Sequence, residues 1–89
     1  MFTKKEQRMA CLTLATMLEN QVQSYYIDIT DVYSEITIHC DTFAELRKAI
    51  GFMNHWQPFE VEKTYNRNDY AEGKKVYCMR IRIKDYKNK

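Results

Sequence analysis

Two stretches of the chain place apolar residues three or four positions apart, which is the spacing of a helix with one buried face. The first stripe consists of Cys11, Leu14, Ala15, Leu18 and Val22. The second consists of Phe43, Leu46, Ala49, Ile50 and Met53. Each follows a capping box, TKKE from Thr3 and TFAE from Thr42, in which a threonine and a glutamate bond each other's backbone amides. We expect these helices to end near residues 23 and 54, the second ahead of the helix-breaking Pro58.

Four other stretches alternate apolar and polar residues, the pattern of half-buried strands. They are YYIDI (25–29), SEITIHC (34–40), PFEVEKTY (58–65) and KKVYCMRIRIK (74–84). The first two are close enough in sequence to form a hairpin. The segment NRNDYAEG (66–73) is rich in turn-forming residues, so we expect a loop between the last two strands.

The element order is therefore αββαββ, which predicts an α+β fold. One apolar face on every element is best buried by a four-stranded, mainly antiparallel sheet with both helices on one side. A ferredoxin-like chain whose first strand is moved to its end has the same order. This permuted arrangement is a hypothesis that requires pairing between the second and fourth strands, with the third strand at an edge. We expect one domain over residues 1–84 and a frayed tail over 85–89.

Strand alternation also predicts which residues occupy the face of the sheet that the helices leave open. They are Tyr26, Asp28, Thr30, Glu35, Thr37, His39, Glu60, Glu62, Thr64, Val76, Cys78, Arg80, Arg82 and Lys84. Outward residues of the last two strands face one another, which brings two glutamates beside Arg80 and Arg82. Opposite charges across strands stabilise the pairing. We therefore favour a salt-bridge ladder over a phosphate-binding row.

Charge is distributed unevenly along this chain of 89 residues, whose formal net charge is +2. Residues 74–89 contain seven basic residues and one acidic residue, a net of +6, which leaves −4 for residues 1–73. Such asymmetry concerns partners and association rather than fold. No apolar run is long enough to cross a membrane, and the N-terminus is too polar for a signal peptide. With three scattered cysteines and no C-x-x-C pair, these features predict a cytoplasmic protein with no membrane contact.

Candidate chemistry is sparse, and we expect no enzyme, cofactor or metal. A metal site would need residues from His39, Cys40, Asp41, His55 and Cys78. His39 and Cys40 are adjacent on a strand and point to opposite faces, which breaks this cluster. No serine or cysteine can be tied to a base and an orienting group. A neighbouring Arg80 could lower the pKa of Cys78, although an inert thiol is the commoner outcome.

Exclusion of catalysis leaves binding as the predicted function. We expect a small non-catalytic regulator or inhibitor that acts on a larger protein or nucleoprotein, like accessory proteins of mobile elements or phages, by analogy only. Tyrosines and arginines are enriched at protein contacts. The candidate contact residues are Tyr26, Tyr33, His39, Arg67, Asp69, Tyr70, Lys74, Lys75 and Lys84. The alternative is nucleic-acid binding through the basic fourth strand and tail. Attraction between the acidic and basic regions could also give a homodimer.

Overall fold

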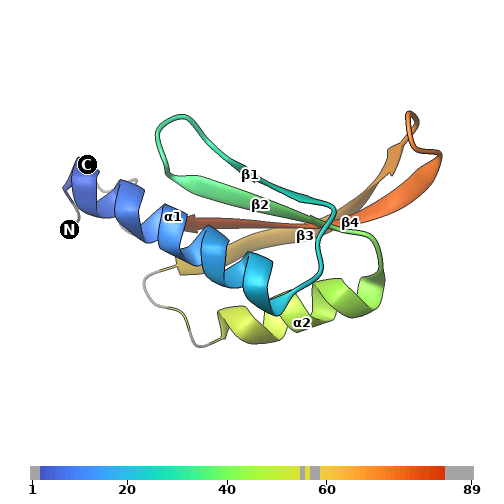
Figure 1. The fold of residues 1–89 in the computed structure, drawn as a ribbon, viewed down its shortest axis with the longest axis horizontal. Coiled ribbons are helices and arrows are strands. Elements are labelled where there is room, and N and C mark those ends of the chain that lie inside the picture. Colours follow the sequence, from blue (N-terminus) through green and yellow to red (C-terminus); the bar gives the residue numbers. More distant parts are fainter. Residues whose placement is uncertain (1–2, 55, 57–58, 84–89) are drawn as a thin grey trace.

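A computed structural model of the chain describes residues 3–54, 56 and 59–83, and contains two helices and a four-stranded sheet (Figure 1). The elements are α1 (Lys4–Gln21), β1 (Tyr26–Ile29), β2 (Glu35–Cys40), α2 (Phe43–Met53), β3 (Phe59–Asp69) and β4 (Lys74–Ile83). The predicted α+β class and αββαββ order are confirmed. His55, Lys84 and the tail over 85–89 lie outside the described residues.

The strands are arranged β1-β2-β4-β3, and every neighbouring pair is antiparallel. β4 is central and β3 lies at an edge. The ladder between β2 and β4 extends from Glu35 opposite Arg82 to Cys40 opposite Tyr77. This is the strand order that the permuted arrangement requires, and its relation to ferredoxin-like proteins remains a hypothesis.

Both helices begin where their threonines predict, but only the first capping box is complete. The Thr3 hydroxyl accepts from the Glu6 amide, and the Glu6 carboxylate accepts from the Thr3 amide, both at 3.0 Å. At α2 the Thr42 hydroxyl accepts from the Glu45 amide at 3.2 Å. The Glu45 carboxylate instead accepts from the Gln23 amide at 3.0 Å. That carboxylate therefore joins the segment after α1 to the first turn of α2.

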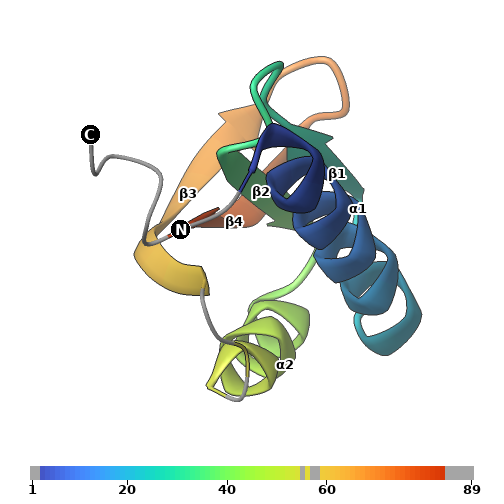
Figure 2. The same ribbon diagram turned by 90° about the vertical axis from the view of Figure 1, so that its left-hand side faces the viewer.

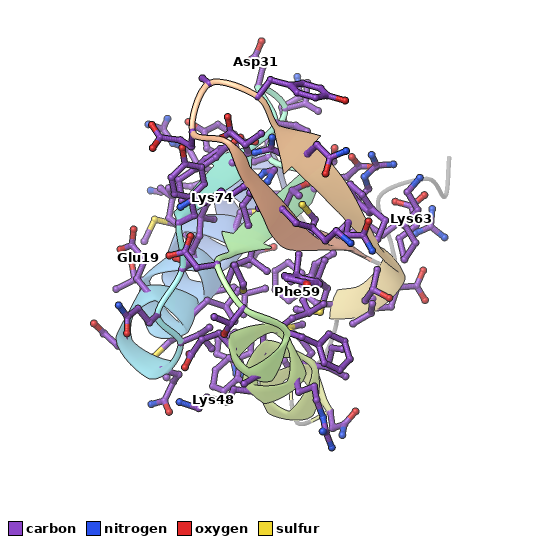
Figure 3. The ribbon with its side chains drawn as sticks, turned by 90° about the vertical axis from the view of Figure 1, so that its right-hand side faces the viewer. Glu19, Asp31, Lys48, Phe59, Lys63 and Lys74 are labelled. Atoms are coloured by element: carbon purple, nitrogen blue, oxygen red, sulfur yellow. The ribbon has the colours of Figure 1, made fainter. Side chains whose placement is uncertain are left out.

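The hydrophobic core lies between the helices and one face of the sheet. α1 contacts β1 and β2, whereas α2 contacts β2, β3 and β4 (Figure 2). Phe59 points from β3 toward α2 (Figure 3) and is buried. The sheet contributes Ile36, Ile38, Cys40, Phe59, Met79, Ile81 and Ile83 to this core. Within the described residues, no helix is long and apolar enough to cross a membrane.

A bulge in β3 changes which residues reach the open face. Glu60 lies opposite Arg82, but the register shifts between Val61 and Lys63, after which Lys63 lies opposite Arg80. An extra residue in one strand reverses the faces of all that follow it. The predicted ladder is therefore reduced to the ion pair between Glu60 and Arg82, at 2.9 Å. The expectation for Thr64 is wrong, because it lies opposite the core residue Met79 and the open face holds Lys63, Tyr65, Arg67 and Asp69 instead. Glu62 is the extra residue of the bulge and has no partner on β4.

The loop predicted over 66–73 is also shorter than expected, because β3 continues to Asp69. The turn occupies residues 70–73 and ends at Gly73, whose φ of 67° is in the left-handed region that favours glycine. The Gly73 amide donates to the Asp69 carbonyl at 2.7 Å and closes the turn. The resulting β3–β4 hairpin projects beyond the rest of the sheet at one end (Figure 1).

Candidate functional site: a polar row on the open sheet face

One row of side chains crosses the open face and takes one residue from every strand. Tyr26 lies opposite His39, His39 opposite Cys78, and Cys78 opposite Tyr65. The alternation of apolar and polar residues along the strands correctly predicted that Tyr26, His39 and Cys78 lie on this face. Tyr65 joins them only because of the bulge in β3.

His39 is the centre of a hydrogen-bond network within this row. Its Nε2 lies 3.0 Å from the Asp28 carboxylate, and its Nδ1 lies 3.3 Å from the Cys78 thiol and 3.4 Å from the Arg67 Nε. A carboxylate only accepts and a guanidinium only donates. The arrangement therefore assigns the proton of a neutral imidazole to Nε2 and leaves Nδ1 to accept from Arg67 and Cys78.

Tyr26 and Arg67 cover the imidazole. The Tyr26 ring stacks on His39 with centroids 4.1 Å apart and an angle of 12° between planes. Arg67 Nη2 donates to the Tyr26 hydroxyl at 3.0 Å. His39 is consequently only 5% exposed, whereas Tyr26 is 41% exposed. The expectation of an accessible His39 on this face is wrong, because its side chain lies under these two neighbours and supports them.

The order Cys78–His39–Asp28 resembles a nucleophile, a base and an orienting acid, a connection that sequence reasoning missed. Burial raises the pKa of the Cys78 thiol, although Arg67 opposes that shift, which agrees with the inert thiol that we favoured over one activated by Arg80. Burial also lowers the pKa of His39, with Asp28 opposing and Arg67 reinforcing that shift. Cys78 is fully buried. A thiolate with access to substrate is what a cysteine nucleophile requires, and this neutral, covered thiol has neither property.

Cations gather around Tyr65 on the same face. The Lys63 ammonium lies 5.2 Å and the Arg80 guanidinium 5.9 Å from the centroid of its ring, within the range of cation–π attraction. Among the described residues, neither cation has an acidic partner within ion-pair distance. We call the exposed part of this surface the cation–tyrosine patch, which consists of Tyr26, Lys63, Tyr65, Arg67 and Arg80.

The other basic residues of β4 are mostly engaged. Arg82 pairs with Glu60, and Lys74 pairs with Asp41 at 2.7 Å. Lys74 also lies 4.0 Å from the centroid of the Tyr25 ring. Lys75, which faces Asn68 across the hairpin, is exposed. Among the described basic residues of β4, Arg80 and Lys75 are therefore the two without an acidic partner within ion-pair distance, and Arg80 belongs to the patch.

The remaining candidate contacts lie apart from the patch. Tyr70 is 88% exposed in the hairpin turn, where Asp69 accepts from the Glu72 amide at 3.2 Å. Tyr33, a predicted contact residue, packs against the core under Arg8, whose guanidinium lies 5.3 Å from the centroid of the Tyr33 ring. Its carbonyl accepts from the Cys11 thiol at 2.8 Å. These contacts to α1 explain why Tyr33 is half-buried.

Metal-ligating side chains do not converge in the part of the chain that the structure describes. Within that part, no three histidine, cysteine, aspartate or glutamate residues are grouped to hold an ion. Cys11, Cys40 and Cys78 are free thiols, and all three are buried.

Comparison with known proteins assigns this chain to no family. The chain matches no protein-family model, no curated protein and no solved structure. A function must therefore be inferred from the polar row and the cation–tyrosine patch.

The lowered pKa of His39 predicts a pH-dependent stability. As the pH falls through about 6.5, His39 becomes protonated in the unfolded chain but stays neutral in the folded protein, because its pKa is lowered there. Proton binding therefore stabilises the unfolded state, and the free energy of unfolding should decrease. We expect wild type to lose more stability than His39→Gln between about pH 7.5 and about pH 5.5, measured by urea unfolding. Because other titrating groups are common to both proteins, equal losses would show that His39 titrates normally.

Proposed function

We propose that this chain is a small, non-catalytic binding protein that contacts a larger protein or nucleoprotein through the open face of its sheet. The observation that supports this most is the fixed position of the patch. Arg67 is held by Tyr26 and His39, and His39 is held by Asp28. A surface ordered before binding loses less conformational entropy when a partner arrives. Tyrosine and arginine are also the side chains that most often dominate binding energy.

Charge on this face favours a protein partner with an acidic region. Lys63, Arg67 and Arg80 lie on β3 and β4, whereas Asp28 and Glu35 lie on β1 and β2. A partner surface with an acidic region facing β3 and β4 and a basic region facing β1 and β2 would be oriented by this charge distribution. The role we propose is that of a regulator or inhibitor, and the three buried thiols are consistent with a reducing, cytoplasmic location.

Nucleic-acid binding is the second candidate, and the cations around Tyr65 are the observation that favours it. Phosphates suit Lys63 and Arg80, and bases can stack on tyrosine. The acidic groups on the same face, Asp28 and Glu35, disfavour a uniform polyanion. Fluorescence anisotropy with single- and double-stranded DNA and RNA tests this candidate. Binding that weakens steeply with salt would support it, and no binding at low salt would exclude it.

Comparative co-purification tests the proposed protein partner. We expect a partner to be retained by tagged wild type and lost by the double variant Lys63→Glu/Arg80→Glu. The matched control is Lys5→Glu/Arg47→Glu, which reverses one lysine and one arginine at exposed positions on the two helices. This control should retain the partner. Equal recovery by all three proteins would place the contact surface elsewhere.

A further inference from the structure

We propose that two copies of this chain pair through the outer edge of β3, which runs antiparallel to its counterpart in the second copy. β3 is an edge strand, and no described element pairs with its outer side. From Arg67 to Asp69 it belongs to the projecting hairpin, beyond the last residue that β4 pairs with β2. Unpaired backbone groups along such an edge are a template for strand addition.

The geometry of antiparallel pairing restricts the possible registers. Identical strands related by a two-fold axis must place residues of the same parity opposite one another, because backbone groups and side chains both alternate along a strand. The axis must therefore pass through a residue rather than between two residues. After the bulge, Lys63, Tyr65, Arg67 and Asp69 all lie on the open face, so they meet one another across the axis.

Charge complementarity selects the axis at Asn66. In this register Lys63 lies opposite Asp69 of the second copy, and Tyr65 lies opposite Arg67 of the second copy. Symmetry forms the ion pair between Lys63 and Asp69 twice, which favours this register, while the Arg67 guanidinium keeps its contacts to Tyr26 and His39 within its own copy. An axis at Tyr65 would instead place Lys63 opposite Arg67, a repulsive pair of cations. An axis at Thr64 pairs no opposite charges, and one at Arg67 places Tyr65 opposite Asp69.

Such a dimer would continue one sheet across both copies. The two-fold axis would be perpendicular to the sheet, with all helices on one side and both open faces on the other. The two cation–tyrosine patches would then adjoin each other. This inference extends the proposed binding surface, but it does not depend on that function, because the charge pairs arise between two copies alone.

The same strand also has features that limit edge pairing. A bulge and an exposed lysine are devices that discourage strand addition. The bulge lies beside Lys63, and therefore confines regular pairing to the segment from Lys63 to Asp69. So short an interface is smaller than that of a stable dimer. We accordingly expect a weak dimer whose population increases with protein concentration.

Engineered cysteines test the register. In the proposed register Asn66 lies opposite Asn66 of the second copy, at a Cα separation of about 4.5–5.5 Å that a disulfide can span. Asn68 of the two copies would be about 13 Å apart, which a disulfide cannot span. Both asparagines are exposed, and the three native thiols are buried. Under mild oxidation Asn66→Cys should form a linked dimer and Asn68→Cys should not; equal linking, or none in either, would overturn the register.

Sedimentation equilibrium tests the charge pairs in the purified chain. Lys63→Glu places glutamate opposite Asp69 twice and should raise the dimer Kd by about tenfold. Glu62→Lys is the control, because it reverses an exposed charge of the same strand at the bulged position, which has no partner on β4. Equal effects of both variants, or a wild type that is monomeric at about 1 mM, would overturn the proposal. A monomeric chain that still loses its protein partner with Lys63→Glu/Arg80→Glu would leave the proposed function intact.

Discussion

Replacement of Ile81 by alanine should lower the free energy of unfolding by about 2–5 kcal/mol, the usual cost of a large cavity in a core. Ile81 is fully buried on the central strand β4, between Ile36 of β2 and Val61 of β3. A domain of this size has a total stability of only about 5–15 kcal/mol. The variant should therefore unfold at a much lower urea concentration, as measured by circular dichroism.

Val61→Ala is the matched control for this core substitution. Val61 is the cross-strand neighbour of Ile81, but it lies at the bulge and is 38% exposed. We expect it to cost about 1 kcal/mol or less, because its side chain keeps contact with water in the folded state. If Val61→Ala were as costly as Ile81→Ala, the bulge would be placed wrongly and Val61 would belong to the core.

Replacement of His39 by alanine should cost about 2–4 kcal/mol. The change removes the stacking contact with Tyr26 and the hydrogen bonds to Asp28 and Cys78, and it leaves a cavity at a position that is 5% exposed. It also removes the acceptor for Arg67. Chemical unfolding measures the loss of stability, and increased mobility of the Arg67 side chain in NMR spectra would show the loss of order in the patch.

Thr37→Ala is the control for His39, since Thr37 lies two residues earlier on the same face of β2. It is opposite Asp28 and Arg80, and the structure gives its side chain no hydrogen bond to a described residue. We expect a cost of about 1 kcal/mol or less. Equal costs for the two variants would mean that His39 does not organise the row.

The sequence predicts the fold well where one side of each strand is apolar. Ile36 and Ile38 in β2, and Met79 and Ile81 in β4, leave a single arrangement that buries them all. A one-residue slip would expose the whole set, so alternation determines their register. The capping threonines likewise determine where both helices begin, because their hydrogen bonds are local.

The same reasoning fails in β3 after Val61. From Glu62 to Asp69 neither parity of the strand is apolar, so no hydrophobic pattern distinguishes one register from the next. The bulge is therefore invisible in the sequence, although the lack of an apolar parity signals that the register is weakly specified. The turn-forming residues at 66–69 led to the prediction of a loop, but these residues pair with β4 and continue the strand.

Parity alone predicts part of the candidate site. It places Tyr26, His39 and Cys78 on the open face correctly. It does not reveal that His39 is covered, because that depends on Arg67 reaching across from β3 after the bulge. The side chains of the row are thus ordered by contacts between strands that are distant in sequence, which strand alternation alone does not predict.

The most direct measurement of the binding surface is the affinity of the co-purified partner for the purified variants, by isothermal titration calorimetry. We expect Lys63→Glu/Arg80→Glu to weaken binding by about tenfold or more, because two central cations become anions. The helix control Lys5→Glu/Arg47→Glu should stay within about twofold of wild type. Unchanged affinity for the patch variant, in a protein of normal stability, would contradict the assignment of the open sheet face as the contact surface.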